Sequence, residues 1–468
     1  MTLERPFAPD SRAGELHQAY GGLPPASETG RRVTVAGRLV LMRTHGRLTF
    51  GELQDWSGRV QLFVDQSVLG DQRYAEFSDL DLGDWVGASG EVITTRRGEL
   101  SVRVEELCLL AKARRPLPEK WHGLKDLEQR HRRRYLDLVS NEEARRTVMR
   151  RVETVRALRL AFERRGFVEV ETPMLQPQPG GALARPFVTH HSALDLDMYL
   201  RVAPELYLKR LVIGGMERIF EINRNFRNEG VSPWHNPEFT MLEAYEAYAD
   251  YLDMMELVEG VVAEVAEGVT GGTTVDYQGK QVDFTPPWRR VSYLEAVEEH
   301  TGIAFDLSSG LDQVRRLAEP LWIAPEPGWG AGKIVAEVFE RHAEPKLWQP
   351  TIVTDHPKET SPLARTHGDD PNLVERFEAI VAGTELANAF SELTDPVEQR
   401  RRFEEQARAR AAGDEEAHPI DEDFLLALEY GMPPTGGLGI GVDRLVMLLT
   451  DQPSIREVIL FPHLRPEP

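Results

Sequence analysis

A chain of 468 residues with 41% hydrophobic and 28% charged side chains is long enough for more than one folded domain, and its composition excludes a disordered polypeptide. Its one cysteine, Cys108, excludes an intramolecular disulfide. With no signal-peptide profile and no long apolar stretch, we expect a cytoplasmic protein without a membrane segment. The formal net charge of −21 argues against a nucleic-acid partner, but residues 31–115 are nearly neutral, with 13 basic and 12 acidic side chains.

The first part of the chain is predicted to hold a small β-barrel. Residues 1–30 contain a Gly-Gly pair, a Pro-Pro pair and no sustained apolar period, so we expect an irregular lead-in. Between residues 31 and 112, short runs alternate polar and apolar side chains and are separated by turns. The expected strands are 33–40, 48–54, 59–64, 84–93 and 99–107. Short antiparallel strands of this number suit a small barrel, and the five-stranded barrel that binds oligonucleotides is the OB-fold.

The rest of the chain is predicted to form a larger α+β domain. Residues 113–135 contain prolines and many charges and are expected to be a linker, followed by a domain over residues 136–468. A long amphipathic helix is expected from Glu142 to Arg165. Later helical patterns alternate with apolar strands, which indicates a mixture of helices and sheet.

Basic side chains gather just after the barrel, although the chain as a whole is acidic. They form one cluster at residues 130–134 (RHRRR) and another that comprises Arg145, Arg146, Arg150 and Arg151. Such a cluster either lies on a solvated surface or contacts phosphate, and the sequence leaves both interpretations open.

Two segments of the large domain combine a strand and a helix in ways that suggest function. In residues 166–175 a short strand and Pro173 follow the long helix, which is consistent with a subunit interface and also with an ordinary helix–strand joint. Residues 437–448 alternate glycines with apolar residues before a helical pattern. They lack the Gly-Lys-Ser/Thr end of a P-loop. The glycines instead favour a strand that lies close to a flat ligand, with Arg444 beside it on the following helix.

A third segment is a predicted hairpin rich in polar side chains. A strand that carries Arg227 and Glu229 leads into a loop with His235 and a second strand with Phe239. An arginine there can bind a phosphate through two hydrogen bonds, and a phenylalanine can stack on a purine. This concentration of residue types favours a nucleotide site over a solvated charged hairpin.

In order and approximate spacing, these segments resemble motifs 1, 2 and 3 of the class II aminoacyl-tRNA synthetases. Within the lysyl, aspartyl and asparaginyl subgroup, four further segments resemble the lysyl members: residues 179–182, 203–209, 383–392 and 427–431. The resemblance covers about residues 31–466. It implies an α+β multidomain protein with an N-terminal OB-fold β-barrel that binds the anticodon. An antiparallel catalytic β-sheet flanked by helices would follow, in a homodimer formed through motif 1.

By this resemblance the chain is expected to activate L-lysine with ATP to lysyl-adenylate and pyrophosphate, and then to transfer lysine to the 3′ end of tRNA(Lys) for protein synthesis. The expected ATP-binding residues are Arg227, Glu229, His235, Asn236, Phe239, Glu378, Glu385, Gly441 and Arg444. Arg227 and Arg444 are also the expected catalytic residues. Glu378 and Glu385 match carboxylates that ligate Mg²⁺, an ion that prefers oxygen ligands and lets substrate phosphates complete its shell.

The resemblance also implies a lysine pocket rich in carboxylates. An ammonium group sheds water on binding, and only carboxylates and other hydrogen-bond acceptors compensate for that loss. The matching positions are Gly181, Glu205, Arg227, Glu243, Tyr245, Asn388 and Glu392. We expect Glu243 and Glu392, assisted by Tyr245, to bind the ε-ammonium, and Glu205 to face the α-amino group. An aspartyl enzyme would need a basic side chain in this pocket instead.

In the barrel, the resemblance places Phe50 and Gln61 at positions that contact the anticodon, with Arg43 as a third expected contact. Single-stranded RNA loops are read by aromatic stacking and amide hydrogen bonds. From the residues alone, Phe50 also fits the barrel core and Gln61 also fits an ordinary exposed strand position.

Two other functions compete with this expectation. One is a non-translational lysyl transferase related to the catalytic domain, but such paralogues generally lack the barrel. The other is an RNA-binding module with an inactive synthetase domain. The presence of Arg227, Glu378, Glu385 and Arg444 together argues against that alternative.

Overall fold

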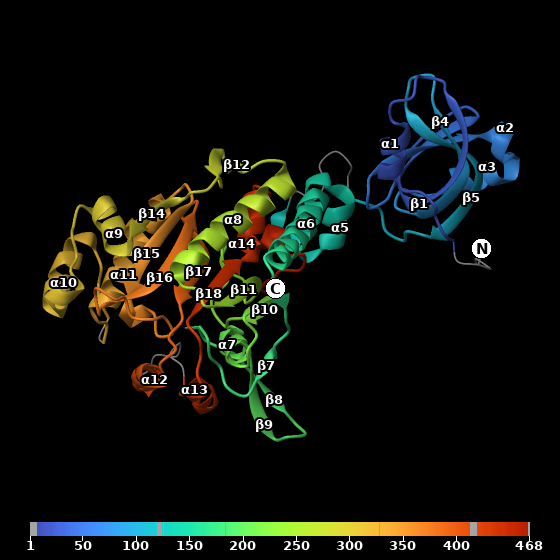
Figure 1. Cartoon of the computed structure of the whole chain (residues 1–468). Coiled ribbons are helices and arrows are strands. Elements are labelled where there is room, and N and C mark those ends of the chain that lie inside the picture. Colours follow the sequence, from blue (N-terminus) through green and yellow to red (C-terminus); the bar gives the residue numbers. More distant parts are fainter. Residues whose placement is uncertain are drawn as a thin grey trace. The chain divides into compact units, whose positions relative to one another are not determined.

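The computed structural model describes residues 7–118, 124, 126–182, 184–326, 328–411 and 419–466. The chain divides into two compact units, whose elements are labelled in Figure 1. The first comprises residues 1–126 and 135–140, and the second comprises residues 127–134 and 141–468. No helix in the described part of the chain is long and apolar enough to cross a membrane.

The first unit is a closed barrel with the strand order β1-β2-β3-β5-β4, which confirms the predicted five-stranded barrel. Its strands are β1 Glu28–His45, β2 Leu48–Gln54, β3 Arg59–Asp65, β4 Trp85–Thr94 and β5 Leu100–Ala111. Short helices accompany them: α1 Ala13–Tyr20, α2 Gln66–Leu69 and α3 Asp71–Ser78. Because side chains alternate along a strand, Val60, Leu62 and Val64 of β3 fill the barrel core while their neighbours face outward.

The expectation of an irregular segment over residues 1–30 is wrong for residues 7–30, and residues 1–6 lie outside the described residues. Helix α1 forms within this segment, and β1 already begins at Glu28. Ala13 and Leu16 of α1 are buried in the barrel core, and the backbone N–H of Ala13 donates to the Asp55 carboxylate at 2.8 Å. The helix is therefore stabilised by tertiary contacts that a weak local pattern does not reveal.

The expected linker over residues 113–135 is wrong at its C-terminal end. Residues Leu127–Arg132 form helix α4, which belongs to the second unit. The next helix, α5 Arg134–Ser140, contains the boundary between the two units. Residues 119–123 and 125, in the middle of the expected linker, lie outside the described residues.

The basic cluster at residues 130–134 makes contacts within the second unit. His131 Nε2 lies 3.1 Å from Glu457 Oε1. The buried Arg134 donates from Nη2 to the carbonyl oxygen of Arg456 at 2.7 Å. These two side chains therefore lie neither on a solvated surface nor against phosphate, because they bind residues 127–134 to the C-terminal segment of the same unit.

The second unit is built on an eight-stranded sheet with the order β14-β15-β16-β17-β18-β11-β10-β6. Neighbouring strands are antiparallel except for the pairs β14–β15 and β10–β6. The strands are β6 Val168–Glu169, β10 Arg218–Phe226, β11 Glu238–Ala247, β14 Arg289–Ser292, β15 Thr351–Pro357, β16 Leu373–Val381, β17 Thr384–Ser391 and β18 Thr435–Gly441. This sheet, with its flanking helices and the separate barrel, confirms the predicted fold class.

Smaller elements surround the large sheet. One small sheet contains β7 Leu175–Gln176, β8 Phe187–His191 and β9 Leu196–Leu200, and a hairpin contains β12 Thr274–Tyr277 and β13 Lys280–Asp283. The remaining helices are α6 Glu142–Arg164, α7 Glu205–Ile213, α8 Tyr251–Thr270, α9 Tyr293–Thr301, α10 Leu311–Ala318, α11 Ala331–His342, α12 Pro396–Ala411, α13 Glu422–Glu429, α14 Val442–Leu449 and α15 Ile455–Val458. Helix α6 matches the predicted long helix to within one residue.

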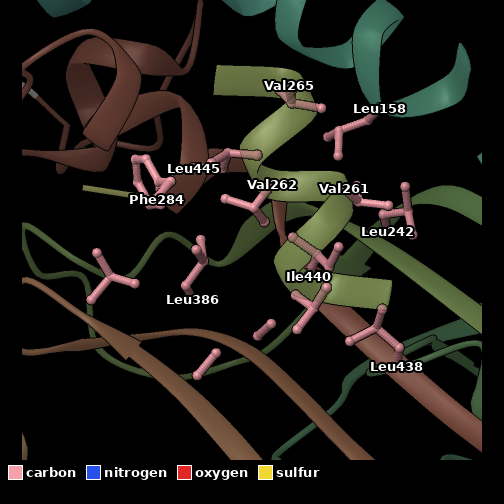
Figure 2. Close-up of a cluster of buried hydrophobic side chains, with 14 of the residues drawn as sticks. Leu158, Leu242, Val261, Val262, Val265, Phe284, Leu386, Leu438, Ile440 and Leu445 are labelled. Atoms are coloured by element: carbon pink, nitrogen blue, oxygen red, sulfur yellow. The ribbon is translucent and has the colours of Figure 1, made fainter. Parts of the chain in front are cut away.

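The main core lies between the sheet and α8, which crosses the central strands (Figure 1). Figure 2 shows Val261 and Val262 of α8 among Leu242, Leu438 and Ile440 of β11 and β18. All five side chains are buried. Because strand side chains alternate, the residues between these apolar positions point to the opposite face of the sheet.

Candidate active site

The face of the sheet opposite α8 carries a transverse row of polar residues and one glycine, each from a different strand. Strand pairing aligns Glu221, Glu243, Gly439, Asn388 and Glu378 across β10, β11, β18, β17 and β16. Residues more than 200 positions apart in the sequence therefore lie in one line. Gly439 at the centre has no side chain, so the row is open in the middle.

This face lines a cavity of about 410 Å³. The structure brings every residue predicted for ATP or lysine to the wall of this one cavity: Gly181, Glu205, Arg227, Glu229, His235, Asn236, Phe239, Glu243, Tyr245, Glu378, Glu385, Asn388, Glu392, Gly441 and Arg444. The cavity is large enough for a small ligand and mixes charged with apolar walls.

One end of the cavity is lined by three buried carboxylates, Glu205, Glu243 and Glu392. Burial raises the pKa of Glu243 to about 8 and raises the pKa of Glu392 well above its usual range. Lys209, which sequence reasoning missed, lies among them with its Nζ 2.5 Å from Glu205 Oε1 and in an ion pair with Glu392. Its position four residues after Glu205 on α7 was the available sequence signal.

The same end of the cavity depends on Gly437, a member of the predicted glycine-rich strand whose place beside Glu392 was missed. Tyr245 donates from its hydroxyl to Glu243 Oε2 at 3.5 Å. A Cβ atom at Gly437 would lie 2.0 Å from Glu392 Oε1 and 2.9 Å from Tyr245 Cε1. The Glu392 carboxylate therefore uses space that only a glycine leaves free.

Arg227 and Phe239 lie together beside the carboxylate end. The Arg227 guanidinium lies over the Phe239 ring, with Cζ 5.0 Å from the ring centroid. Its buried Nε has no hydrogen-bond partner among the residues that the structure describes. An unpaired buried donor of this kind fits an anionic ligand group.

The predicted position of Arg227 and Glu229 within a strand is wrong. Strand β10 ends at Phe226, so both residues lie in the loop that leads to β11. In that loop the Ser232 hydroxyl lies 2.9 Å from His235 Nδ1. Burial, reinforced by Arg444, lowers the pKa of His235, so its imidazole is mainly neutral at pH 7. Polar loop ends of this type are hard to separate from strands by alternation alone.

Arg444 lies at the start of α14, as predicted, directly after the glycine-rich strand β18. Its Nη1 is 3.2 Å from Glu385 Oε2. The neighbouring Asp443 is buried and accepts a hydrogen bond from the backbone N–H of Thr240 at 2.7 Å. Asp443 therefore joins α14 to β11 and holds Arg444 at the cavity wall.

Arg376, on the cavity wall, is a second residue that sequence reasoning missed. It donates from Nη2 to Glu378 Oε1 at 2.6 Å and from Nε to Asn388 Oδ1 at 2.9 Å. Burial raises the pKa of Glu378 to about 7 against the opposing charge of Arg376, and Glu385 raises it further. Its place two residues before Glu378 on one strand puts both side chains on the same face.

The barrel carries its predicted nucleic-acid residues on one outer face. Arg43 pairs with Phe50 across β1 and β2, and Phe50 pairs with Phe63 across β2 and β3. Phe50 is half-exposed, so it does not belong to the barrel core. Gln61 is two residues from Phe63 on the same side of β3 and accepts a hydrogen bond from Ser101 at 2.9 Å. The aromatic Phe63 is an addition to the predicted set.

The sheet, the cavity and the barrel define the class to which the chain belongs. Residues 126–465 match the family described as tRNA synthetases class II (D, K and N), and residues 33–110 match the OB-fold nucleic acid binding domain. The chain therefore belongs to the class II tRNA synthetases of the D, K and N group.

Individual relatives are similar over almost the whole chain. A protein of Moorella thermoacetica named lysine–tRNA ligase is 56% identical over 94% of this chain and 90% of its own length. Lysine–tRNA ligases of Syntrophomonas wolfei and of a Synechococcus species are 51% and 53% identical over 99% and 98% of this chain, and each alignment covers 93% of the relative. The similarity thus includes both the barrel and the catalytic unit.

Proposed function

We propose that this chain is a lysine–tRNA ligase that uses ATP to activate L-lysine and then esterifies tRNA(Lys) with it. The observation that carries the proposal is the group of three buried carboxylates, Glu205, Glu243 and Glu392, at one end of the cavity. This group suits a substrate with two ammonium groups and would repel the side chain of aspartate.

The orientation of lysine follows from the charges around the cavity. Glu243 and Glu392, with the Tyr245 hydroxyl, bind the ε-ammonium at the carboxylate end of the cavity in this proposal. Glu205 accepts the α-ammonium beside Gly181, whose positive φ and small size allow it to lie against Glu205 Cβ. Arg227 and Asn388 then face the lysine carboxylate, which is the nucleophile.

ATP occupies the opposite end of the cavity in this proposal. Phe239 stacks on adenine, and Asn236, Glu229 and His235 bind the nucleotide from the loop after β10. Arg227 stabilises the negative charge that develops on the α-phosphate, while Arg444, next to Gly441, binds the distal phosphate. All bonds that form or break belong to lysine, ATP and tRNA. The protein therefore acts by orienting these reactants and by electrostatic stabilisation.

The chemistry has two balanced steps. A lysine carboxylate oxygen attacks the α-phosphorus of ATP, the new P–O bond gives lysyl-adenylate, and pyrophosphate leaves. The terminal ribose hydroxyl of tRNA then attacks the carbonyl carbon, the C–O bond to the phosphate breaks, and the products are lysyl-tRNA, AMP and the proton of the hydroxyl. A neutral His235 near the phosphates is consistent with a positioning role and not with an additional positive charge.

Glu378 and Glu385 are the residues that would hold Mg²⁺. Glu378 has a pKa raised to about 7 by burial and by Glu385, so a bound cation would relieve the repulsion between them. The described residues contain no group of three or more His, Cys, Asp or Glu side chains placed to hold a metal ion. A site of two carboxylates completed by phosphate oxygens fits this arrangement and would neutralise charge on ATP.

We further propose that the outer face of the barrel binds the anticodon loop. Phe50 supplies a stacking platform, Gln61 an amide and Arg43 a charge for the backbone. In Phe50→Ala we expect aminoacylation of tRNA(Lys) to fall by about ten-fold or more while lysine-dependent pyrophosphate exchange without tRNA stays unchanged, because stacking contributes about 1–3 kcal/mol per base. Trp56→Ala, in the exposed β2–β3 turn, is the matched aromatic control. Equal loss in both variants would contradict this part of the proposal.

The central test is ATP–pyrophosphate exchange with each of the twenty amino acids. We expect exchange with lysine alone, and its loss in Glu392→Gln while circular dichroism shows that the variant remains folded. Glu267→Gln on the exposed side of α8 is the control. Exchange with aspartate or asparagine would refute the assignment of the pocket, and absence of any exchange would favour an RNA-binding module with an inactive synthetase domain.

A further inference from the structure

The protein supplies a buried ammonium group of its own at the carboxylate end of the cavity. Lys209 is fully buried on α7, and its Nζ forms ion pairs with both Glu205 and Glu392. The rings of Phe390 and Phe424 lie 5.4 and 5.9 Å from the same nitrogen. Lys209 is thus held by two carboxylates and two aromatic faces.

Stability alone is a weak explanation for this arrangement. Desolvation of an ammonium and two carboxylates is unfavourable, and apolar side chains of similar volume usually stabilise a protein equally well. Burial by itself would lower the pKa of Lys209, but Glu205 and Glu392 raise it, so this ammonium stays charged. A permanent positive charge next to the proposed substrate carboxylates therefore requires a functional reason.

Lys209 leaves one oxygen of Glu392 available. Lys209 lies in an ion pair with Oε2 of Glu392, and neither oxygen of this buried carboxylate has a hydrogen-bond partner among the described residues. The ion pair to Oε2 leaves Oε1 as the second acceptor. That oxygen is directed toward the backbone of Gly437, on the cavity wall. Since a carboxylate accepts several hydrogen bonds, Glu392 can bind Lys209 through one oxygen and a ligand ammonium through the other.

The charges of the pocket balance only when Lys209 is counted. Glu205, Glu243 and Glu392 carry three negative charges when ionised, and Lys209 reduces the sum to two. Free lysine brings two ammonium groups, while its carboxylate faces Arg227. Without Lys209, one carboxyl of the occupied pocket would have to keep a proton, and a neutral carboxyl binds an ammonium less strongly than a carboxylate does.

We propose that Lys209 is a positioning residue for lysine recognition, whose ammonium fixes the Glu205 and Glu392 carboxylates and matches the pocket charge to a substrate with two ammonium groups. This inference rests on the proposed function. It adds a residue that does not touch the substrate but acts through the two carboxylates that do.

The first experiment compares Lys209→Met with the wild-type chain in lysine-dependent pyrophosphate exchange. We expect the KM for lysine to rise by about ten-fold or more, as for loss of one partner in a buried ion pair, with the KM for ATP nearly constant. The preference for lysine over norleucine, which lacks the ε-ammonium, should fall in parallel. Lys280→Met is the matched control, because Lys280 is exposed and contacts Trp348 outside the cavity.

Chemical rescue separates charge from packing. In Lys209→Ala, propylammonium should restore a low lysine KM because it returns an ammonium to the space of the deleted side chain, whereas propanol of similar size should not. Rescue by both compounds would mean that Lys209 only fills volume and would overturn the proposal. An unchanged lysine KM in Lys209→Met would overturn it as well.

A measurement on the wild-type chain decides the question if the variants do not fold. Among the described lysines, Lys209 is the one that is buried, so its ¹⁵N-labelled ammonium should give a slowly exchanging resonance. We expect this resonance to persist and shift when unlabelled lysine is added. Its loss on lysine addition would show displacement from the carboxylates and would overturn the proposal. Absence of lysine-dependent exchange in the wild type would instead refute the proposed function.

Discussion

At the scale of single residues, the role proposed for Glu243 predicts that lysine recognition depends on pH. Burial raises its pKa to about 8, and the nearby Glu205 and Glu221 add to the rise. In the empty pocket the group is therefore mostly protonated at pH 7, whereas the substrate ammonium binds the ionised form. We expect the KM for lysine to fall by about five-fold as pH rises from 7 to 8, because the ionised fraction of a group with a pKa of about 8 rises from about one-eleventh to one-half over that range.

The measurement is the lysine KM in pyrophosphate exchange between pH 6.5 and 8.5. Glu243→Gln should bind lysine weakly at every pH and should lose this part of the dependence. A lysine KM that stays constant over the range in the wild-type chain would contradict the assigned role of Glu243.

A substitution at Gly437 tests whether the Glu392 carboxylate needs the space that this glycine leaves free. In Gly437→Ala the new Cβ would lie 2.0 Å from Glu392 Oε1, and the ion pair with Lys209 restricts the carboxylate from moving away. We expect the KM for lysine to rise by about ten-fold or more, with little change in the KM for ATP. Gly272→Ala is the control, because its Cβ would have no atom within 4 Å. Equal kinetics in both variants would refute the role of Gly437.

The sequence predicts the acidic wall of the pocket better than its basic wall. Glu205, Glu243 and Glu392 follow from the lysyl resemblance, and the structure brings all three to one cavity. Lys209 and Arg376 were missed because their partners, Glu392 and Asn388, are distant in the sequence. These pairs are recognised only in the folded chain. A spacing of four residues in a helix or two in a strand shows which side chains share a face. It does not show that this face lines the cavity.

At the scale of elements, the contact between α6 and α14 holds the part of the cavity wall that carries Arg444. Arg151 Nη1 on α6 lies 2.5 Å from Asp443 Oδ1 on α14, and both side chains are nearly buried. Arg151→Met leaves an unpaired buried carboxylate. We expect a loss of about 3–5 kcal/mol in the free energy of unfolding, measured by urea denaturation.

A surface pair on the same helix provides the comparison. Arg146 lies 3.8 Å from Glu142, and both side chains are largely exposed. Arg146→Met should change the free energy of unfolding by less than about 1 kcal/mol, because solvent screens exposed pairs. If the two substitutions destabilised the chain equally, the Arg151–Asp443 pair would not be the contact that we describe.

Regular elements were predictable where a periodic pattern continues over many residues. The barrel strands and helix α6 follow from alternation and from a long apolar stripe, respectively. Helices α1 and α4 were missed because their stability comes from contacts with residues far along the chain, such as Asp55 for α1 and Glu457 for α4. Local sequence carries little information about such contacts.

At the scale of the whole molecule, the segment after α6 presents apolar side chains to solvent and adjoins the carboxylate end of the cavity. Met174 and Leu175 are exposed there. The neighbouring Thr172 donates to Glu221 Oε2 at 2.7 Å, and Glu221 is paired with Glu243 across β10 and β11. We propose that this segment forms the interface of a homodimer, since exposed apolar patches mark association sites.

In Met174→Asp combined with Leu175→Asp, we expect light scattering to show a monomer where the wild-type chain has twice its mass, because a charge in an apolar interface is unfavourable. Lysine-dependent exchange should also weaken, since a displaced Thr172 no longer positions Glu221 beside Glu243. Val397→Asp, at an exposed apolar position at the start of α12, should leave the mass and the exchange rate unchanged. A dimeric double variant would exclude this segment as the interface, and a fully active monomer would show that the pocket does not depend on it.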